Sequence, residues 1–177
     1  HVTVLDSIYD QVKKKFQESR CYFLTKEEAA KVGEVFFNSA THGVKATAVG
    51  RPATKLAEMA GIKVPADTKV LIAETDDTSH DNAWANEKLC PVLGMYHAKD
   101  FPQAMDICYK LVTEGGAGHG SLIIFGAEDV SDARRAVEVC LREVERTMGD
   151  VYGSPAGHLE FQYTARASHA LNKAFGA

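Results

Sequence analysis

Two short apolar runs limit what this chain can fold into more than any other feature. The first is Val70–Ala73 and the second is Pro91–Tyr96. Runs this short and this apolar are typical of strands that are buried on both faces of a parallel sheet. Segments before and after them carry apolar residues three or four positions apart, which is typical of amphipathic helices. The pattern therefore predicts an α/β fold with a parallel sheet.

Helix start signals occur at three places before the first run. Asp6 is expected to cap a helix, and Thr25 with Glu28 has the spacing of a capping box. Pro52 is expected to begin a third helix that turns Met59 inward and ends at a glycine.

A βαβ unit is expected around the second run. The strand at Pro91–Tyr96 is followed by helical spacing over Phe101–Glu114 and by an apolar run at Ser121–Phe125. Strand, helix and strand of this length predict a right-handed crossover. Further on, the sequence predicts a helix from Ser131 to Gly149, a short strand at 161–164 and a final helix at 165–175.

Charge and composition exclude several classes of protein. The 177 residues include 20 Lys and Arg against 24 Asp and Glu, so the positive surplus typical of nucleic-acid binders is absent. No apolar run approaches the roughly 20 residues of a membrane span, and no signal peptide is expected. The four cysteines show no metal-ligand spacing and are expected to be reduced thiols: Cys21, Cys90, Cys108 and Cys140. We therefore expect no metal site, no nucleic-acid partner and no membrane partner.

Two polar residues are candidate site residues, each with a structural alternative. Glu87 leads into the strand at Pro91–Tyr96, and its carboxylate can accept two hydroxyls from a ribose or simply be a solvent-exposed loop acid. His119 lies in the glycine-rich run Gly115–Gly120, where it can donate to a substrate oxygen or be a hydrogen-bonded loop histidine. The glycines follow a helix and precede a strand, which is the reverse of the order in a phosphate-binding loop. This run is therefore predicted to be a helix stop.

Several segments together carry a resemblance to a known family. They are Asp6–Asp10, Ala48–Gly50, Leu56–Pro65, Glu87–Tyr96, Ala98–Phe101 and Gly115–His119. From His1 to about residue 120, the chain resembles the catalytic domain of CoA-acylating aldehyde dehydrogenases, especially the aldehyde half of bifunctional aldehyde–alcohol dehydrogenases. The resemblance implies that an aldehyde is oxidised by NAD through a cysteine thiohemiacetal, and that the resulting thioester passes to CoA.

Residue by residue, the resemblance assigns roles to two residues and finds no residue for the role of the nucleophile. Glu87 matches the acid that binds the nicotinamide ribose, and His119 matches the histidine of a Gly-Gly-x-Gly-His segment near the active site. The family's nucleophilic cysteine lies a few residues before the point aligned with His1, and Cys90 lies in the wrong motif to replace it. The family's cofactor-binding domain also has no counterpart in these residues. We therefore expect a fragment that is inactive alone and binds neither NAD nor CoA tightly.

The last third of the chain carries a second resemblance. Its segments are Gly115–Ile124, Asp129–Asp132, Gly149–Gly153 and Leu159–Ser168. They resemble the tandem-domain trimeric shell protein of propanediol-utilisation bacterial microcompartments. The usage of basic residues changes at the same place, because 12 Lys and 2 Arg precede Gly115 while 1 Lys and 5 Arg follow it. We therefore expect residues 1–114 to derive from the dehydrogenase and residues 115–177 from the shell protein, with the junction within 115–120.

Two functions stay open at this point. The first is a fragment of an NAD-dependent CoA-acylating aldehyde dehydrogenase, whose partners are an aldehyde and CoA. The second is a structural piece of a microcompartment shell, whose partners are copies of itself or other shell subunits. Both imply a bacterial cytoplasmic protein, and the second also implies association with a microcompartment. The sequence assigns no role to His97, His158 or His169.

Overall fold

The chain divides into two compact units, His1–Gly116 and Ala117–Ala177. The computed structural model describes residues 1–114, 121–122 and 160–161. The elements expected at 131–149 and 165–175 therefore lie outside the described residues, as does His119. No helix in the described part of the chain is long and apolar enough to cross a membrane.

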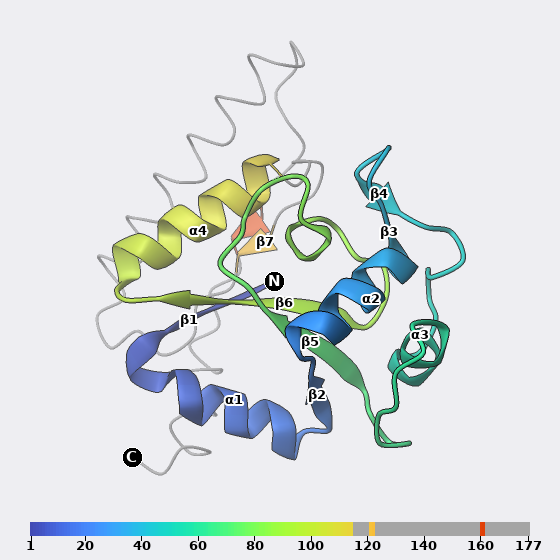
Figure 1. The fold of residues 1–177 in the computed structure, drawn as a ribbon. Coiled ribbons are helices and arrows are strands. Elements are labelled where there is room, and N and C mark those ends of the chain that lie inside the picture. Colours follow the sequence, from blue (N-terminus) through green and yellow to red (C-terminus); the bar gives the residue numbers. More distant parts are fainter. Residues whose placement is uncertain (115–120, 123–159, 162–177) are drawn as a thin grey trace. The chain divides into compact units, whose positions relative to one another are not determined.

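The first unit alternates strands and helices along the chain (Figure 1). In order, its elements are β1 (Val2–Leu5), the 3-10 helix η1 (Asp6–Ile8), α1 (Tyr9–Glu18), β2 (Cys21–Phe23), α2 (Lys26–Phe36), β3 (Phe37–Asn38), β4 (Gly43–Val44), α3 (Ala53–Met59), β5 (Val70–Glu74), the 3-10 helix η2 (Ala83–Ala85), β6 (Val92–Ala98) and α4 (Phe101–Glu114). One parallel sheet has the order β1-β6-β5-β2, while β3 and β4 form a separate antiparallel pair. The predicted α/β fold with a parallel sheet is confirmed.

Helices cover both faces of this sheet. Side chains alternate along a strand, so the neighbours Leu71 and Ile72 of β5 point to opposite faces. Ile72 packs in a cluster with α1, whereas Leu71 packs in a cluster with α2 and α3, and both side chains are fully buried. α4 covers the sheet through Leu111, which packs against Tyr96 of β6. Burial on both faces explains why the strand sequence is apolar throughout.

The helix starts expected from the sequence have different outcomes. The capping box at α2 is confirmed, because the Glu28 backbone N–H donates to Thr25 Oγ1 at 3.2 Å and the Thr25 N–H donates to Glu28 Oε2 at 2.9 Å. The expected cap at Asp6 is wrong, since Asp6 lies inside η1 and α1 begins after Ile8 without a side-chain cap. The Asp6 carboxylate instead contacts His97, with 2.7 Å between Oδ1 and Nδ1.

The expected inward position of Met59 is also wrong. Ala53, Leu56 and Ala57 make up the buried face of α3, and Met59 lies beside that face with 41% of its surface exposed. The expected end of the helix is confirmed, because Gly61 follows it with a φ of +68°.

The βαβ unit expected around β6 differs from the observed pairing. The helix is present as α4, but the following strand β7 (Ser121–Leu122) pairs in parallel with β8 (Glu160–Phe161) in a sheet of its own. A further strand cannot pair with β6, because β1 and β5 already occupy its two edges.

Candidate functional site

The segment that connects β5 to β6 carries Glu87 and is anchored by a tryptophan. Asn82 Oδ1 accepts a hydrogen bond from the Trp84 N–H at 3.1 Å, which starts the short helix η2. The Trp84 indole is 5% exposed and donates to the Ala29 carbonyl of α2 at 3.2 Å. Its ring also packs edge-on against Phe36, with 5.2 Å between centroids. These contacts fix the start of the segment on α2.

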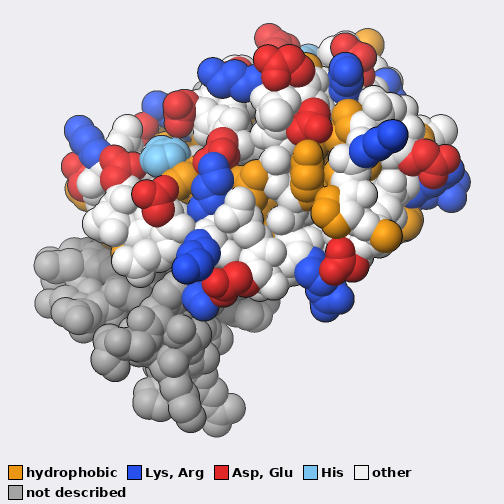
Figure 2. Space-filling model, turned by 60° about the horizontal axis from the view of Figure 1, so that its bottom comes forward, with side chains coloured by type: hydrophobic (Ala, Val, Ile, Leu, Met, Phe, Trp, Pro, Cys, Tyr) orange, Lys and Arg blue, Asp and Glu red, His pale blue; other side chains and the backbone are white. Residues whose placement is uncertain are grey.

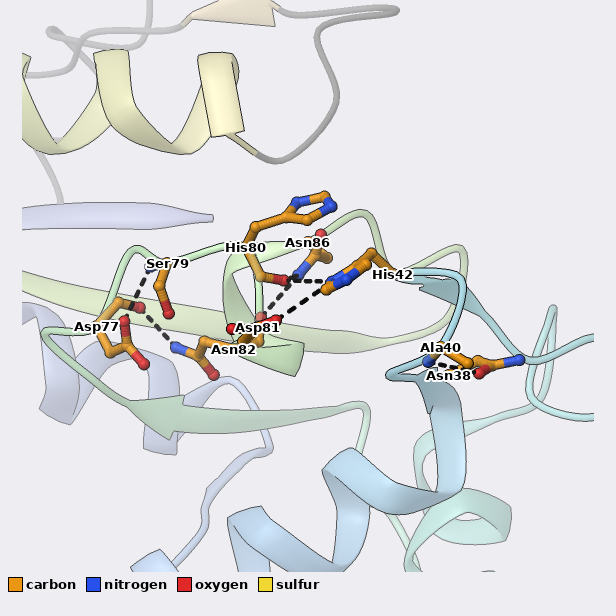
Figure 3. Close-up of polar contacts among 9 residues, drawn as sticks. All are labelled: Asn38, Ala40, His42, Asp77, Ser79, His80, Asp81, Asn82 and Asn86. Atoms are coloured by element: carbon orange, nitrogen blue, oxygen red, sulfur yellow. Dashed lines mark hydrogen bonds and ion pairs between the residues drawn. The ribbon is translucent and has the colours of Figure 1, made fainter.

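A buried asparagine holds the next turn of this segment (Figure 3). The Asn86 side chain is 1% exposed, and its amide donates to the carbonyls of His80 at 2.7 Å and Asn82 at 2.8 Å. His42 reaches the same turn from the β3–β4 hairpin, since its Nδ1 lies 3.1 Å from the His80 carbonyl and the two rings stack 4.0 Å apart. Within the described part of the chain, Asn86 Oδ1 has no hydrogen-bond partner.

Strand β6 packs tightly against this segment. A Cβ atom at Gly94 would lie 2.7 Å from the Trp84 carbonyl oxygen. The Tyr96 hydroxyl donates to the same carbonyl at 3.3 Å. Backbone therefore lies against backbone at Gly94, and a side chain has no room there.

Glu87 follows the anchored turn and points into solvent. Its side chain is exposed, and among the described residues its carboxylate has neither a hydrogen-bond nor an ion-pair partner. Leu89, two positions on, is 57% exposed. Both carboxylate oxygens of Glu87 are thus available as acceptors, as ribose binding requires and as a loop acid also allows.

Lys88 turns the other way, into the fold, and no sequence pattern predicts this burial. Its side chain is 8% exposed, and Nζ donates to the Asn86 carbonyl at 2.8 Å and lies 3.3 Å from His1 Nδ1. No Asp or Glu of the described residues lies within ion-pair distance of Nζ. Burial without a counterion lowers the pKa of Lys88 to about 7.

The described cysteines do not provide an activated nucleophile. Cys21, Cys90 and Cys108 are free thiols, and burial raises the pKa of each. A reactive cysteine needs the opposite shift, because the thiolate is the attacking form. Cys140 lies outside the described residues. In the part of the chain that the structure describes, no group of His, Cys, Asp and Glu side chains is arranged to hold a metal ion.

A second polar cluster, which no sequence motif predicts, lies at the carboxyl ends of the strands β1, β5 and β6. The Tyr9 hydroxyl donates to Glu74 Oε1 at 2.8 Å, and Lys13 Nζ lies 2.7 Å from Glu74 Oε2. His97 stacks on Tyr9 with 3.3 Å between centroids and pairs with Asp6. Burial alone would raise the pKa of Glu74, but the hydrogen bonds from Lys13 and Tyr9 hold it below its usual value. Figure 2 shows acidic and basic side chains interspersed in this way over one face of the first unit.

Comparisons with known proteins connect this fold to both resemblances. No family model matches the chain. The microcompartment shell protein PduB of Salmonella typhimurium is 43% identical over 150 residues, which covers 76% of this chain and 55% of that protein. The bifunctional aldehyde-alcohol dehydrogenase AdhE of Escherichia coli is 42% identical over 122 residues, which covers 69% of this chain and 14% of that protein. The structure of an acetylating aldehyde dehydrogenase from Geobacillus thermoglucosidasius matches with a TM-score of 0.68 at 30% identity, over 90% of this chain and 32% of that one.

Both resemblances are confirmed. The chain spans about half the length of the shell protein, and it spans smaller shares of the two dehydrogenases. Because the shares of 76% and 69% together exceed the whole chain, some of its residues align with both kinds of protein. The chain therefore resembles part of an acylating aldehyde dehydrogenase and part of a shell protein, and the whole of neither.

Proposed function

We propose that residues 1–114 are part of the catalytic domain of an NAD-dependent enzyme that oxidises an aldehyde and passes the acyl group to CoA. The observation that carries this proposal is the four-stranded parallel sheet, together with the TM-score of 0.68 at 30% identity to an acetylating aldehyde dehydrogenase. The boundary between the compact units, after Gly116, supports a junction within 115–120 and a shell-derived segment from residue 115 onward.

In this proposal Glu87 accepts hydrogen bonds from the two hydroxyls of the nicotinamide ribose. Two observations support the binding of the ribose by Glu87. Its carboxylate is exposed and has no partner among the described residues, and the contacts of Trp84 and Asn86 fix the loop before it. NAD, when bound, would accept the hydride from the carbon of the aldehyde. His119 is proposed to lie near the reacting aldehyde.

By itself the 177-residue chain is proposed to be inactive. The family that it resembles needs a cysteine thiolate as nucleophile, and among the described residues burial raises the pKa values of Cys21, Cys90 and Cys108 away from that reactive form. NAD and CoA are proposed as the cofactors of the enzyme family that residues 1–114 resemble, and this chain alone is proposed to hold neither tightly.

The role of Glu87 can be tested in a chimera in which residues 1–114 replace the matching part of the Geobacillus thermoglucosidasius enzyme. Glu87→Gln is expected to raise KM for NAD about tenfold and to change kcat less, because loss of a charge-assisted hydrogen bond costs about 1.5 kcal/mol or more. Steady-state NADH formation gives both constants. Glu58→Gln is the control, since Glu58 is an exposed acid of α3 paired with Lys55. An unchanged KM for NAD in Glu87→Gln would exclude the ribose contact.

A second candidate function is structural, and the 43% identity to the shell protein PduB favours it. Here the chain is a piece of a microcompartment shell that associates with copies of itself or with other shell subunits. Electron microscopy of the purified chain tests this second candidate: trimers or hexagonal sheets support the shell function, and their absence counts against it. We infer a place in the bacterial cytoplasm for the first candidate and in a microcompartment for the second.

A further inference from the structure

Glu87 lies between two side chains that point into the fold. Asn86 before it is 1% exposed and Lys88 after it is 8% exposed, whereas Glu87 itself belongs to the exposed residues. The backbone at Asn86 is extended, with a φ of −95° and a ψ of 172°, and successive side chains of an extended segment point to opposite sides. The outward direction of Glu87 therefore depends on the inward direction of its two neighbours.

The Asn86 amide is fixed by two hydrogen bonds to the backbone (Figure 3). Its Nδ2 donates to the His80 carbonyl at 2.7 Å and to the Asn82 carbonyl at 2.8 Å. Both hydrogens of the amide are thus used, and a flipped amide would place an oxygen against two carbonyl oxygens. The Asn86 side chain therefore has one favourable orientation in this turn, and it can leave only if two carbonyls lose a donor.

Lys88 holds the same residue through its backbone. Its Nζ donates to the Asn86 carbonyl at 2.8 Å and lies 3.3 Å from His1 Nδ1. Asn86 is thus held both by its side chain and by its carbonyl. Because the Glu87 carboxylate has no partner among the described residues, only these neighbouring contacts fix its direction.

We propose that Asn86 is a positioning residue for Glu87, whose carboxylate it holds in the outward direction that ligand binding requires. A carboxylate that is held in place before the ligand arrives loses less conformational freedom on binding. The identity of that ligand, the nicotinamide ribose, rests on the proposed function. The positioning itself needs only the contacts of Asn86.

Hydrogen exchange in the 177-residue chain tests the hold on this segment. The Ala85 N–H donates to the Asn82 carbonyl at 2.9 Å, and Asn86 contacts the same carbonyl, so this amide reports on the turn. Asn86→Leu keeps the volume of the side chain but removes both donors. It is expected to speed exchange in peptides that cover residues 82–90 by at least about fivefold. Unchanged exchange in these peptides would overturn the proposal.

Thr25→Ala is the control for this experiment. It removes the hydrogen bond that Thr25 Oγ1 accepts from the Glu28 N–H in the cap of α2. Exchange over residues 82–90 is expected to stay at the wild-type rate in this variant, because the loss is confined to the start of α2. Faster exchange over these residues in Thr25→Ala, equal to that in Asn86→Leu, would overturn the proposal.

A double-mutant cycle in the chimera separates positioning from a general loss of stability. Asn86→Leu is expected to raise KM for NAD about fivefold, with a smaller change in kcat. In a Glu87→Ala background the same substitution is expected to raise KM less than about twofold, because the carboxylate that Asn86 positions is gone. A rise of the same size in both backgrounds, or no rise in the first, would overturn the proposal.

A second variant and a separate readout cover the remaining outcomes. If Asn86→Leu does not fold, Asn86→Ser replaces it, since a serine hydroxyl donates one hydrogen bond and serves at most one of the two carbonyls. If Glu87→Ala leaves KM for NAD unchanged, the ribose contact fails. The exchange experiment then decides by itself whether Asn86 holds Glu87 in place.

Discussion

Gly94→Ala is expected to lower the free energy of unfolding of the first unit by about 3 kcal/mol, because inserting a methyl group into a packed core forces the backbone apart. The new Cβ would lie 2.7 Å from the Trp84 carbonyl oxygen and 3.2 Å from the Tyr96 ring. The carbonyl belongs to backbone that Tyr96 and the Trp84 contacts hold in place, so it cannot move cheaply. Urea unfolding followed by the fluorescence of Trp84, the single tryptophan of the chain, measures the change.

Gly43→Ala is the matched control for this substitution. Gly43 also lies in a strand, but a Cβ there would meet only Thr41 atoms at 3.6 Å or more. The control is expected to change the free energy of unfolding by less than about 1 kcal/mol. Equal effects of the two substitutions would contradict the close packing of β6 against the η2 segment.

Raising the pH from 7 to 8.5 is expected to stabilise the fold by about 1.5 kcal/mol through Lys88. The pKa of Lys88 is lowered from 10.5 to about 7 in the folded chain. Between these two values the unfolded chain binds a proton that the folded chain does not, so stability rises with pH by up to about 1.4 kcal/mol per unit. Stopping at pH 8.5 avoids most of the thiol titration of the unfolded chain. Urea unfolding at several pH values measures the slope.

Lys88→Met isolates this contribution. The variant keeps a long apolar side chain but has no titratable group, so the Lys88 part of the slope is expected to vanish. Lys55→Met removes an exposed lysine instead and is expected to keep the wild-type slope. A wild-type slope in Lys88→Met would show that Lys88 titrates normally in the folded chain.

The elements that the sequence predicts correctly are those that depend on residues close to one another along the chain. The capping box of α2 needs only Thr25 and Glu28, three positions apart, and it is present in the structure. Strand β5 was predicted because Val70–Ala73 is apolar on both faces. The bounds of α4, Phe101–Glu114, agree with the prediction because apolar spacing begins and glycines follow at those positions.

Contacts between distant residues explain what the sequence could not predict. Asp6 was expected to cap its own helix, but it pairs with His97, a residue 91 positions away. Tyr9 and Glu74 are 65 positions apart and meet only because β1 and β5 lie in one sheet. At the candidate site, Glu87 could be proposed from its motif, whereas the burial of Lys88 depends on His1 and on the folded turn at Asn86.

The most direct test of the central claim is NADH formation by the wild-type chimera that carries residues 1–114 in the Geobacillus thermoglucosidasius enzyme. With an aldehyde, NAD and CoA, the chimera is expected to form NADH at a rate within about tenfold of the parent enzyme. The 177-residue chain alone is expected to form none under the same conditions. A chimera that melts cooperatively but forms no NADH would contradict the claim, and so would steady NADH formation by the chain alone.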